Sequence, residues 1–349
     1  MQRIPFSQPS FDEEETRAIE RVLSSRWIVE GPERDAFEKE FAQFIGAPEI
    51  IAVSGATEAL FLLLKAHGIA PGDEVIVPSL TFVATAHVVL HTGATPVFAD
   101  VTPYPHLCLD PKDVAAKRTS KTKVVIPVHY AGNLAFRDYD DLLVIEDSAH
   151  RIESNDMGKN PMAFSFHATK NVTSGRGGAI AVHDTEKASW LRKARNFGIT
   201  KDSVERYQQG SWRYSVDFAG WSFHLTDIAA SLGRVQLKKL PNFLSKRKEF
   251  VDLYNNLLGL NNTGLHLYPI LVNDRAAFIN WMHEHHVQCS VHFQPLHLMP
   301  LYKNSVKLPV TESVGEKLVS LPLYPKLSHD EVDYIANLIK AWQKKHGKP

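Results

Sequence analysis

The chain has 349 residues, and its 39 basic side chains balance 39 acidic ones, so the formal net charge is zero. This balance argues against a nucleic-acid partner, because general nucleic-acid binders carry a basic surplus or a basic stripe. The 2 cysteines, Cys108 and Cys289, are too few for a disulfide framework, a four-cysteine zinc site or an iron–sulfur cluster.

The sequence also lacks membrane and secretion signals. No apolar run reaches the roughly 18–20 residues that a membrane helix needs. The segment from Met1 to Phe6 has no apolar signal core, and acidic residues follow from Asp12. We therefore expect a cytoplasmic, globular protein that has no membrane partner and acts on a small molecule.

Short apolar runs alternate with helical patterns over the first two-thirds of the chain. The segment 33–46 predicts a helix, because Phe37, Phe41, Phe44 and Ile45 share one face and a glycine follows. Strands are predicted over 50–53, 74–78, 96–101, 123–128, 142–147 and 178–183, and helices over 57–67, 82–91 and 186–197. Since the strands lack apolar/polar alternation, both faces of their sheet are expected to be covered. The predicted fold is α/β, with a three-layer α/β/α large domain and a mostly parallel sheet.

The pattern changes after about residue 240. A long helix is predicted over 226–240, and Pro241 follows it directly. Strands over 265–272 and 289–293 and helices over 276–286 and 329–345 come next, which is enough for a small α+β domain. We therefore predict a large domain over 1–240 and a small C-terminal domain over 241–349.

One segment at a strand end is a candidate phosphate site. In doubly wound sheets, ligands bind at the carboxyl ends of the strands. Ser54-Gly55-Ala56-Thr57 lies between a predicted strand and a predicted helix, where free N–H groups and the helix dipole can hold a phosphate. Taken alone, such a turn is more often merely structural. It lacks the dinucleotide fingerprint and the P-loop pattern, which disfavours NAD and ATP.

Two further segments contribute ionisable groups. Glu146-Asp147 ends an apolar strand, where carboxylates are costly to bury unless a cation such as a pyridinium nitrogen compensates them. Lys170 follows an apolar-aromatic run, and partial desolvation lowers the pKa of a lysine and favours Schiff-base formation. Each has a plain alternative, a solvated strand end or a surface lysine. Together with the phosphate turn, they are the three parts that pyridoxal 5'-phosphate (PLP) requires.

In this order and spacing, the three segments resemble the DegT/DnrJ/StrS family of PLP-dependent sugar aminotransferases, which have the fold-type I aminotransferase architecture. Further blocks that agree with the family lie at 78–86, 93–101, 127–132, 195–199, 226–233, 292–297 and 320–325. The resemblance covers nearly the whole chain and is specific, because many blocks agree in order. It implies an aminotransferase with PLP as cofactor and no metal.

The resemblance assigns a catalytic residue and two ring contacts. Lys170 is expected to form the Schiff base with the cofactor and then to move a proton as general base and general acid. Asp147 is expected to pair with the pyridinium N1–H, which keeps the ring a strong electron sink. His150 is expected near the O3′ side of the ring.

Four more residues are expected to bind the cofactor. Phe82 is expected to stack on the ring face. The backbone amides of Gly55 and Ala56, with the hydroxyl of Ser165, are expected to hold the phosphate. The alternative for Ser165 is a plain turn serine.

Two places depart from the family pattern. The family commonly shows Gly-x-Asn-x-Arg-Met before the long helix, and its Asn reaches the phosphate of the neighbouring subunit. This chain has Ser222 and His224 at the Asn and Arg positions. Ser222 can still donate one hydrogen bond, so it is kept as a candidate cofactor-binding residue. Arg176 stands where glutamate is usual, and both departures bear on which sugar is accepted.

The resemblance implies transfer of an amino group from an amino acid, expected to be L-glutamate, to a keto-sugar. The sugar is expected to be nucleotide-linked and to belong to deoxyamino-sugar biosynthesis, as for lipopolysaccharide or antibiotic sugars. A sugar dehydratase of the same family is one alternative. Such enzymes replace the Schiff-base lysine with histidine and some use an iron–sulfur cluster, so Lys170 and the scarcity of cysteine count against it. A non-catalytic regulatory protein is the other alternative, which Arg176 and Ser222 leave open.

The resemblance further implies a homodimer with a shared active site. Aromatic residues outside any periodic element are consistent with an interface: Tyr207, Trp212, Tyr214, Phe218, Trp221 and Phe223. The alternative is packing of these rings onto their own large domain. His292 and His297 are expected either to reach the substrate or to pack in the core. The histidine-rich segment 283–286 lacks metal-site spacing and is interpreted as a solvated helix end.

Overall fold

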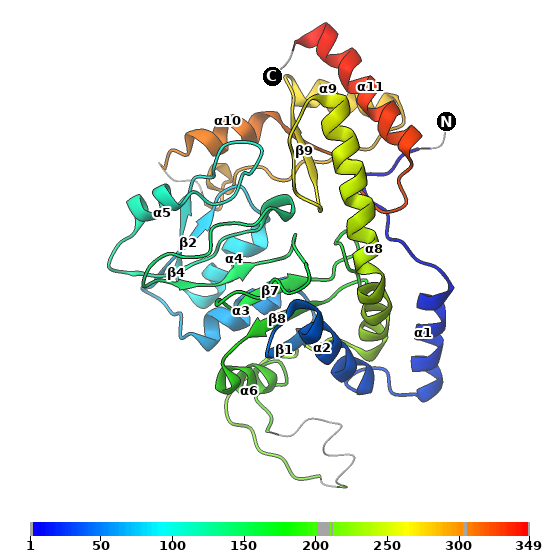
Figure 1. Cartoon of the computed structure of the whole chain (residues 1–349). Helices are drawn as coiled ribbons and strands as arrows, with labels where there is room; N and C mark the ends of the chain where they lie inside the picture. Colours follow the sequence, from blue (N-terminus) through cyan, green and yellow to red (C-terminus); the bar gives the residue numbers. More distant parts are fainter. Residues whose placement is uncertain (1–2, 201–209, 211, 303–305, 348–349) are drawn as a thin grey trace.

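The computed structural model describes residues 3–200, 210, 212–302 and 306–347. A central sheet lies between helices, and the C-terminal helices gather around β9 at one end of the molecule (Figure 1). Within the described residues, no helix is both long enough and apolar enough to cross a bilayer.

The strands of the large region form one continuous sheet. Two four-stranded ladders, β3-β2-β4-β5 and β6-β7-β8-β1, join where only Ile145 separates β5 from β6. Ile145 donates its N–H to the carbonyl of Val125 at 3.0 Å, and Asp147 of β6 makes a parallel bridge with Val128 just beyond β4. Among the described strand pairs of this sheet, those of β8 with β1 and β7 are antiparallel and the others are parallel. The strands are β1 Glu49–Val53, β2 Glu74–Pro78, β3 Thr95–Ala99, β4 Thr122–Val125, β5 Leu143–Val144, β6 Glu146–Asp147, β7 Met162–Ser165 and β8 Gly178–Val182.

Both faces of this sheet are covered, as the unbroken apolar runs predict. Ile51 and Val53 of β1 pack into one core, whereas Ile50 and Ala52 pack into another. The helices that contribute to the first core are α3 Ala56–Ala66, α4 Val83–Thr92 and α6 Thr185–Ala194, and those of the second are α2 Pro32–Ile45 and α8 Asp227–Leu258. Since successive strand residues point to opposite faces, a strand buried on both sides must be apolar throughout. The predicted three-layer α/β/α fold is confirmed.

Helix α8 passes through Pro241, so the predicted helix end at residue 240 is wrong. A proline inside a helix removes one hydrogen bond and crowds the preceding turn, at a cost of about 3 kcal/mol. Burial outweighs that cost here, because Leu240 and Phe243 flank the proline and Phe250 lies further along, all three buried.

The predicted domain boundary at 240/241 falls inside α8. The first part of α8 shares a core with α2, and its last part shares a separate core with α11 (His329–His346). The helix therefore joins two cores, and the division into 1–240 and 241–349 stays a prediction.

The C-terminal part contains a two-stranded antiparallel sheet of β9 (Tyr268–Leu271) and β10 (Leu318–Leu321). The predicted strand over 289–293 is wrong, because Ser290 makes only one isolated bridge, with Ser320 of β10. After that bridge the chain leaves the sheet and carries His292 and Phe293 to a cavity. Helices α9 Arg275–Glu284 and α10 Pro309–Lys317 complete this part.

The chain also forms helices that the sequence did not predict, which are α10 and two others, α1 Glu13–Ser25 and α5 Pro111–Lys117. In α1 a capping box satisfies the first turn: the Asp12 side chain accepts from the N–H of Glu14 at 2.8 Å, and Glu15 accepts from that of Asp12 at 2.9 Å. The buried residues of α1 are Glu15, Ala18 and Val22, so only two of its apolar side chains are in the core.

The aromatic segment before α8 divides into two groups. Phe218, Trp221 and Phe223 pack against the core that contains α3, as the alternative of intramolecular packing anticipated. Trp212 and Tyr214 are exposed, at 78% and 52%. Tyr207 lies outside the described residues.

Candidate active site

A cavity of about 500 Å³ lies at the carboxyl ends of the strands. Its volume is in the range of small-molecule sites. The predicted residues that line it are Gly55, Ala56, Phe82, Asp147, His150, Ser165 and Lys170. The structure thus brings together seven of the eight predicted site residues, which come from four separate turns. Ser222 is exposed and does not line the cavity of its own chain.

Lys170 lies in the turn between β7 and β8. The backbone N–H of Lys170 donates to the carbonyl of His167 at 2.9 Å, and this hydrogen bond closes the turn that carries the lysine. Burial lowers the pKa of Lys170 to about 8, and the carboxylate of Asp147 opposes that shift. The amine is therefore partly neutral near physiological pH, as a nucleophile or general base requires.

Asp147 ends β6 and is buried, with 5% of the residue exposed. Its carboxylate accepts hydrogen bonds from the Thr85 hydroxyl at 2.9 Å and from the N–H of Ala149 at 3.1 Å. Burial raises the pKa of Asp147 above its ordinary value, although both hydrogen bonds and the charge of Lys170 act in the opposite direction. The charged form of Asp147 is therefore only partly compensated, and a further cationic partner would stabilise it.

His150 follows Asp147 by three residues and is also buried. Its Nδ1 lies 3.3 Å from the N–H of Ala131, which donates to it, so the ring proton is on Nε2. Burial, and then the charge of Lys170, hold the pKa of His150 well below its ordinary value. A neutral ring that donates from Nε2 lines the cavity.

The turn at Gly55 forms a tight cradle with β8. A Cβ on Gly178 would lie 2.4 Å from the carbonyl carbon of Gly55 and 2.7 Å from the nitrogen of Ala56. Only glycine at 178 lets the strand pass this close to the start of α3. The N-cap residue of α3 is Gly55, which has no side chain to cap the helix. The first N–H groups of α3 are therefore available to an anion. Ser165, at the end of β7, lines the same cavity.

Phe82 precedes α4, and 57% of the residue is exposed. The ring lines the cavity, and its centroid is 6.0 Å from that of Phe293. Such an uncovered aromatic face is suited to stacking against a planar ligand.

A profile of the DegT/DnrJ/EryC1/StrS aminotransferase family matches residues 9–340. The chain belongs to this family. The spore coat polysaccharide biosynthesis protein SpsC of Bacillus subtilis is 36% identical over an alignment of 375 residues, gaps included. The alignment covers 97% of this chain and 96% of SpsC.

Solved structures agree with the family. The PMP form of Spr1654 from Streptococcus pneumoniae, assigned as a sugar aminotransferase, has a TM-score of 0.91 and 31% identity, covering 98% of this chain and 99% of that chain. PseC of Helicobacter pylori, an aminotransferase involved in the biosynthesis of pseudoaminic acid, has a TM-score of 0.90 and 26% identity, covering 98% and 100%. The resemblance predicted from the sequence is confirmed, and the chain is an aminotransferase by family.

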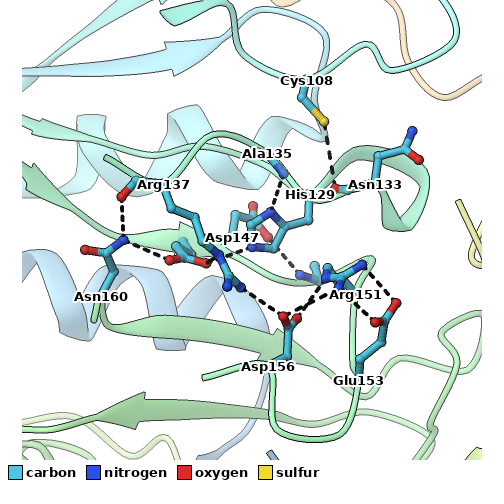
Figure 2. Close-up of polar contacts among 12 residues, drawn as sticks. Cys108, His129, Asn133, Ala135, Arg137, Asp147, Arg151, Glu153, Asp156 and Asn160 are labelled. Atoms are coloured by element: carbon cyan, nitrogen blue, oxygen red, sulfur yellow. Dashed lines mark hydrogen bonds and ion pairs between the residues drawn. The ribbon is translucent and has the colours of Figure 1, made fainter. Parts of the chain in front are cut away.

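The family fold also places polar residues that sequence reasoning missed. Figure 2 shows His129, Arg137 and Asn160 within a polar network beside Asp147. Glu146, the other strand-end carboxylate, belongs to this network and is fully buried. Glu146 is 2.8 Å from Nε2 of His129 and 2.8 Å from Nε of Arg137, and it accepts from Nδ2 of Asn160 at 2.9 Å. Burial raises the pKa of Glu146, but these partners outweigh it and hold the pKa below its ordinary value.

The two candidate histidines of the C-terminal part have different positions. His292 lines the cavity, and burial lowers its pKa to about 4. His297 is fully buried outside the cavity lining, where its Nδ1 is 2.7 Å from the hydroxyl of Ser79. His297 therefore packs in the core, which was one of the two expectations for these residues. His292 lies at the cavity, where the other expectation placed a residue that reaches the substrate.

Two other cavity residues gave no signal in the sequence. Phe6 of the N-terminal segment stacks on His292 with 5.1 Å between ring centroids. His266 lies next to His150, at 4.4 Å between centroids. Both reach the cavity through contacts between segments that are distant in the sequence, which no local pattern encodes.

Proposed function

We propose that this aminotransferase transfers the amino group of L-glutamate to a nucleotide-linked keto-sugar in the biosynthesis of a deoxyamino sugar. The cofactor of this family member is PLP, which the PLP form of Spr1654 also carries. The observation that carries the proposal is a half-buried lysine of lowered pKa, Lys170, in one cavity with a buried carboxylate, Asp147.

The residues of the cavity fit PLP at both ends. At one end, the uncapped N–H groups at the start of α3, the glycine contact at 178 and the Ser165 hydroxyl suit a phosphate. At the other end, Asp147 is a buried carboxylate whose raised pKa a neighbouring pyridinium would lower. We therefore assign Gly55, Ala56 and Ser165 to the phosphate and Asp147 to the ring nitrogen.

When bound, PLP supplies an aldehyde that condenses with amines and a ring that withdraws electrons. Lys170 provides the amine that holds the aldehyde and, once released, the base. With a pKa of about 8, roughly a tenth of its Nζ is unprotonated at pH 7, so it can accept a proton from the α-carbon of the donor and return it to the acceptor. Because the turn at His167 fixes the backbone of Lys170, the amine stays near the reacting carbon.

The other cavity residues orient and protect the ring. Asp147 keeps the ring nitrogen protonated, and Thr85 and Ala149 hold its carboxylate in place. His150 is positioned to donate from Nε2 to a ring oxygen. Phe82 is suited to cover one face of the ring and to exclude water from it.

Two relatives support a sugar as the acceptor. SpsC is a spore coat polysaccharide biosynthesis protein, and PseC is an aminotransferase involved in the biosynthesis of pseudoaminic acid. The nucleotide link and the glutamate donor follow the family resemblance of the sequence.

We also propose that the chain forms a homodimer with a shared active site. Trp212, Tyr214 and Val216 are more than half exposed, which is costly for a surface that stays in water. Ser222 is exposed outside its own cavity, so its predicted phosphate contact requires a second copy of the chain. Light scattering at micromolar concentration should give twice the mass of 39.2 kDa. A fully active monomer would contradict the shared site.

The reaction is tested in two half-reactions. Glutamate should convert the cofactor from its PLP absorbance band to that of PMP and release 2-oxoglutarate. The PMP form should then aminate one member of a panel of nucleotide-linked 3- and 4-keto sugars, with the product identified by mass. Failure of glutamate, glutamine and aspartate alike to convert the band would overturn the proposal, as would a deoxygenated product without nitrogen.

A further inference from the structure

Arg176 is a charged residue at the cavity that the proposed chemistry does not use. It lines the cavity, and its side chain is 78% exposed. Among the described residues that line the cavity, only Arg176 and Lys170 are arginine or lysine. Lys170 is committed to the cofactor. Arg176, which is always charged, is therefore the cation at this cavity that is left to bind an anionic group of a substrate.

The backbone that carries Arg176 is held firmly. The Ser174 hydroxyl donates to the carbonyl of Arg176 at 3.1 Å, and the N–H of Phe166 donates to the carbonyl of Gly177 at 2.8 Å. A Cβ on Gly177 would lie 2.5 Å from the Ser174 hydroxyl and 2.7 Å from Leu225, so the chain is closely packed there. The Cα of Arg176 is thus fixed, whereas its guanidinium extends into solvent.

The ion pair of Arg176 is weak. One guanidinium nitrogen lies 3.5 Å from Oε1 of Glu58. A single long contact made by a mostly exposed guanidinium contributes little to stability. The second oxygen of Glu58, Oε2, is buried and has no hydrogen-bond partner among the described residues. Arg176 can therefore exchange this carboxylate for an oxyanion that accepts two parallel hydrogen bonds.

The charge of Arg176 acts inside the cavity. His167, which lines the same wall, has a pKa below its ordinary value because of burial and then of the charges of Lys170 and Arg176. The loop between β7 and β8 therefore presents a positive wall, with Lys170 at its buried end and Arg176 at its exposed end.

We propose that Arg176 is a specificity-determining residue that binds an oxyanion carried by a substrate, and that Glu58 holds the guanidinium until that oxyanion arrives. This inference rests on the proposed function. The oxyanion has two possible sources, the side-chain carboxylate of a dicarboxylic amino donor and the phosphate of a nucleotide-linked acceptor. Both present two oxygens in the geometry that a guanidinium binds.

Direct binding tests the proposal without turnover. The probes are glutarate, a dicarboxylate without an amine, and uridine diphosphate, each titrated calorimetrically into the cofactor-loaded enzyme. Arg176→Gln should weaken one probe by tenfold or more, and that probe identifies the source. Arg176→Lys should weaken the same probe less, because it keeps the charge but loses the bidentate geometry. Glu58→Gln should strengthen the same probe severalfold, because it removes the competing carboxylate.

Arg17→Gln is the matched control. Arg17 also makes one exposed ion pair, at 3.4 Å to Glu13 in α1, and it does not line the cavity. Its loss should leave the affinity for both probes within twofold of the unchanged protein. Raising the salt concentration should reduce the effect of Arg176→Gln, because exposed charges are screened over about 8 Å at 0.15 M.

The result that overturns the inference is distinct from failure of the proposed function. The inference is wrong if both probes bind Arg176→Gln within twofold of the unchanged enzyme, or if neither probe binds at all. The proposed function is wrong if no amino acid converts the cofactor band, whatever the probes do. If the affinity for a probe depends on Arg176 but no amino acid converts the cofactor band, the result supports the anion site and not the proposed function.

Discussion

Glu146 and Asp147 are consecutive carboxylates on one short strand, yet their surroundings are opposite. Glu146 is fully buried among His129, Arg137 and Asn160, and its pKa is lowered. Asp147 lines the cavity with two neutral donors, and burial raises its pKa. Successive strand residues point to opposite faces, so one dipeptide supplies a structural carboxylate and a reactive one. Burial alone does not mark a functional group, whereas a buried charge without a full set of partners does.

The largest expected effect comes from Asp147→Asn. The amide cannot keep the ring nitrogen protonated, so amino transfer should fall at least about a hundredfold. The free energy of unfolding should stay the same or rise, because the substitution removes a buried charge whose burial cost outweighs its hydrogen bonds and the nearby charge of Lys170. Stopped-flow measurement of the glutamate half-reaction and urea unfolding of the same sample check both parts. A stable variant with unchanged kinetics would remove Asp147 from the site.

Glu146→Gln should give the reverse result. The substitution removes the buried carboxylate that Arg137 and His129 share and leaves Arg137 only its longer ion pair with Asp156, at 3.3 Å, so the free energy of unfolding should fall by about 3 kcal/mol. The rate of the glutamate half-reaction per folded molecule should change by less than about threefold, since Glu146 does not line the cavity. A rate loss as large as that of Asp147→Asn would show that the network acts on the cofactor.

The pH dependence of stability separates the two carboxylates further. The native pKa of Glu146 is below the ordinary value of 4.5, so its stabilising contribution is complete above that value and is lost as pH falls through the lower native pKa. The native pKa of Asp147 is above the ordinary value of 3.8, so protonation as pH falls through that raised pKa relieves a cost. Lowering the pH should therefore narrow the stability gap between the unchanged protein and Glu146→Gln. Lowering the pH should also raise the stability of the unchanged protein relative to Asp147→Asn. If the curves of unfolding free energy against pH for both variants run parallel to that of the unchanged protein, the assignment is wrong.

Phe82→Leu should have the smallest effect. Aromatic stacking adds about 0.5–1.5 kcal/mol beyond burial, so the PLP dissociation constant should rise about two- to tenfold with little loss of stability. Phe136→Leu is the control, because Phe136 is 48% exposed and contacts Tyr139 outside the cavity lining. Equal PLP affinity in the two variants would mean that Phe82 does not touch the cofactor.

The sequence predicts the α/β/α fold and the chemistry at the strand ends, because both depend on local patterns. Apolar runs such as that of β1 indicate strands buried on both faces, Asp147 ends an apolar run, and Lys170 follows an apolar-aromatic run. Tertiary contacts decide the rest. Burial of Leu240 and Phe243 carries α8 through Pro241, and the strand that pairs with β9 is β10 and not the predicted strand over 289–293.

The missed cavity residues have the same explanation. Phe6 and His266 reach the cavity from segments far from the strand ends, so no spacing predicts them. The local pattern alone did not separate Glu146 from Asp147, and it was the family resemblance that assigned Asp147 to the ring nitrogen. In the structure, the packing of Arg137 and Asn160 behind the strand distinguishes the two faces.

The central claim is that Lys170 is the residue that carries the cofactor. Borohydride reduction of the holoenzyme, followed by digestion and peptide mass spectrometry, tests it most directly. The predicted result is one reduced phosphopyridoxyl adduct, located on Lys170, with loss of the visible band and no adduct in Lys170→Ala. An adduct on any other lysine, or a visible band that persists in Lys170→Ala, would contradict the account.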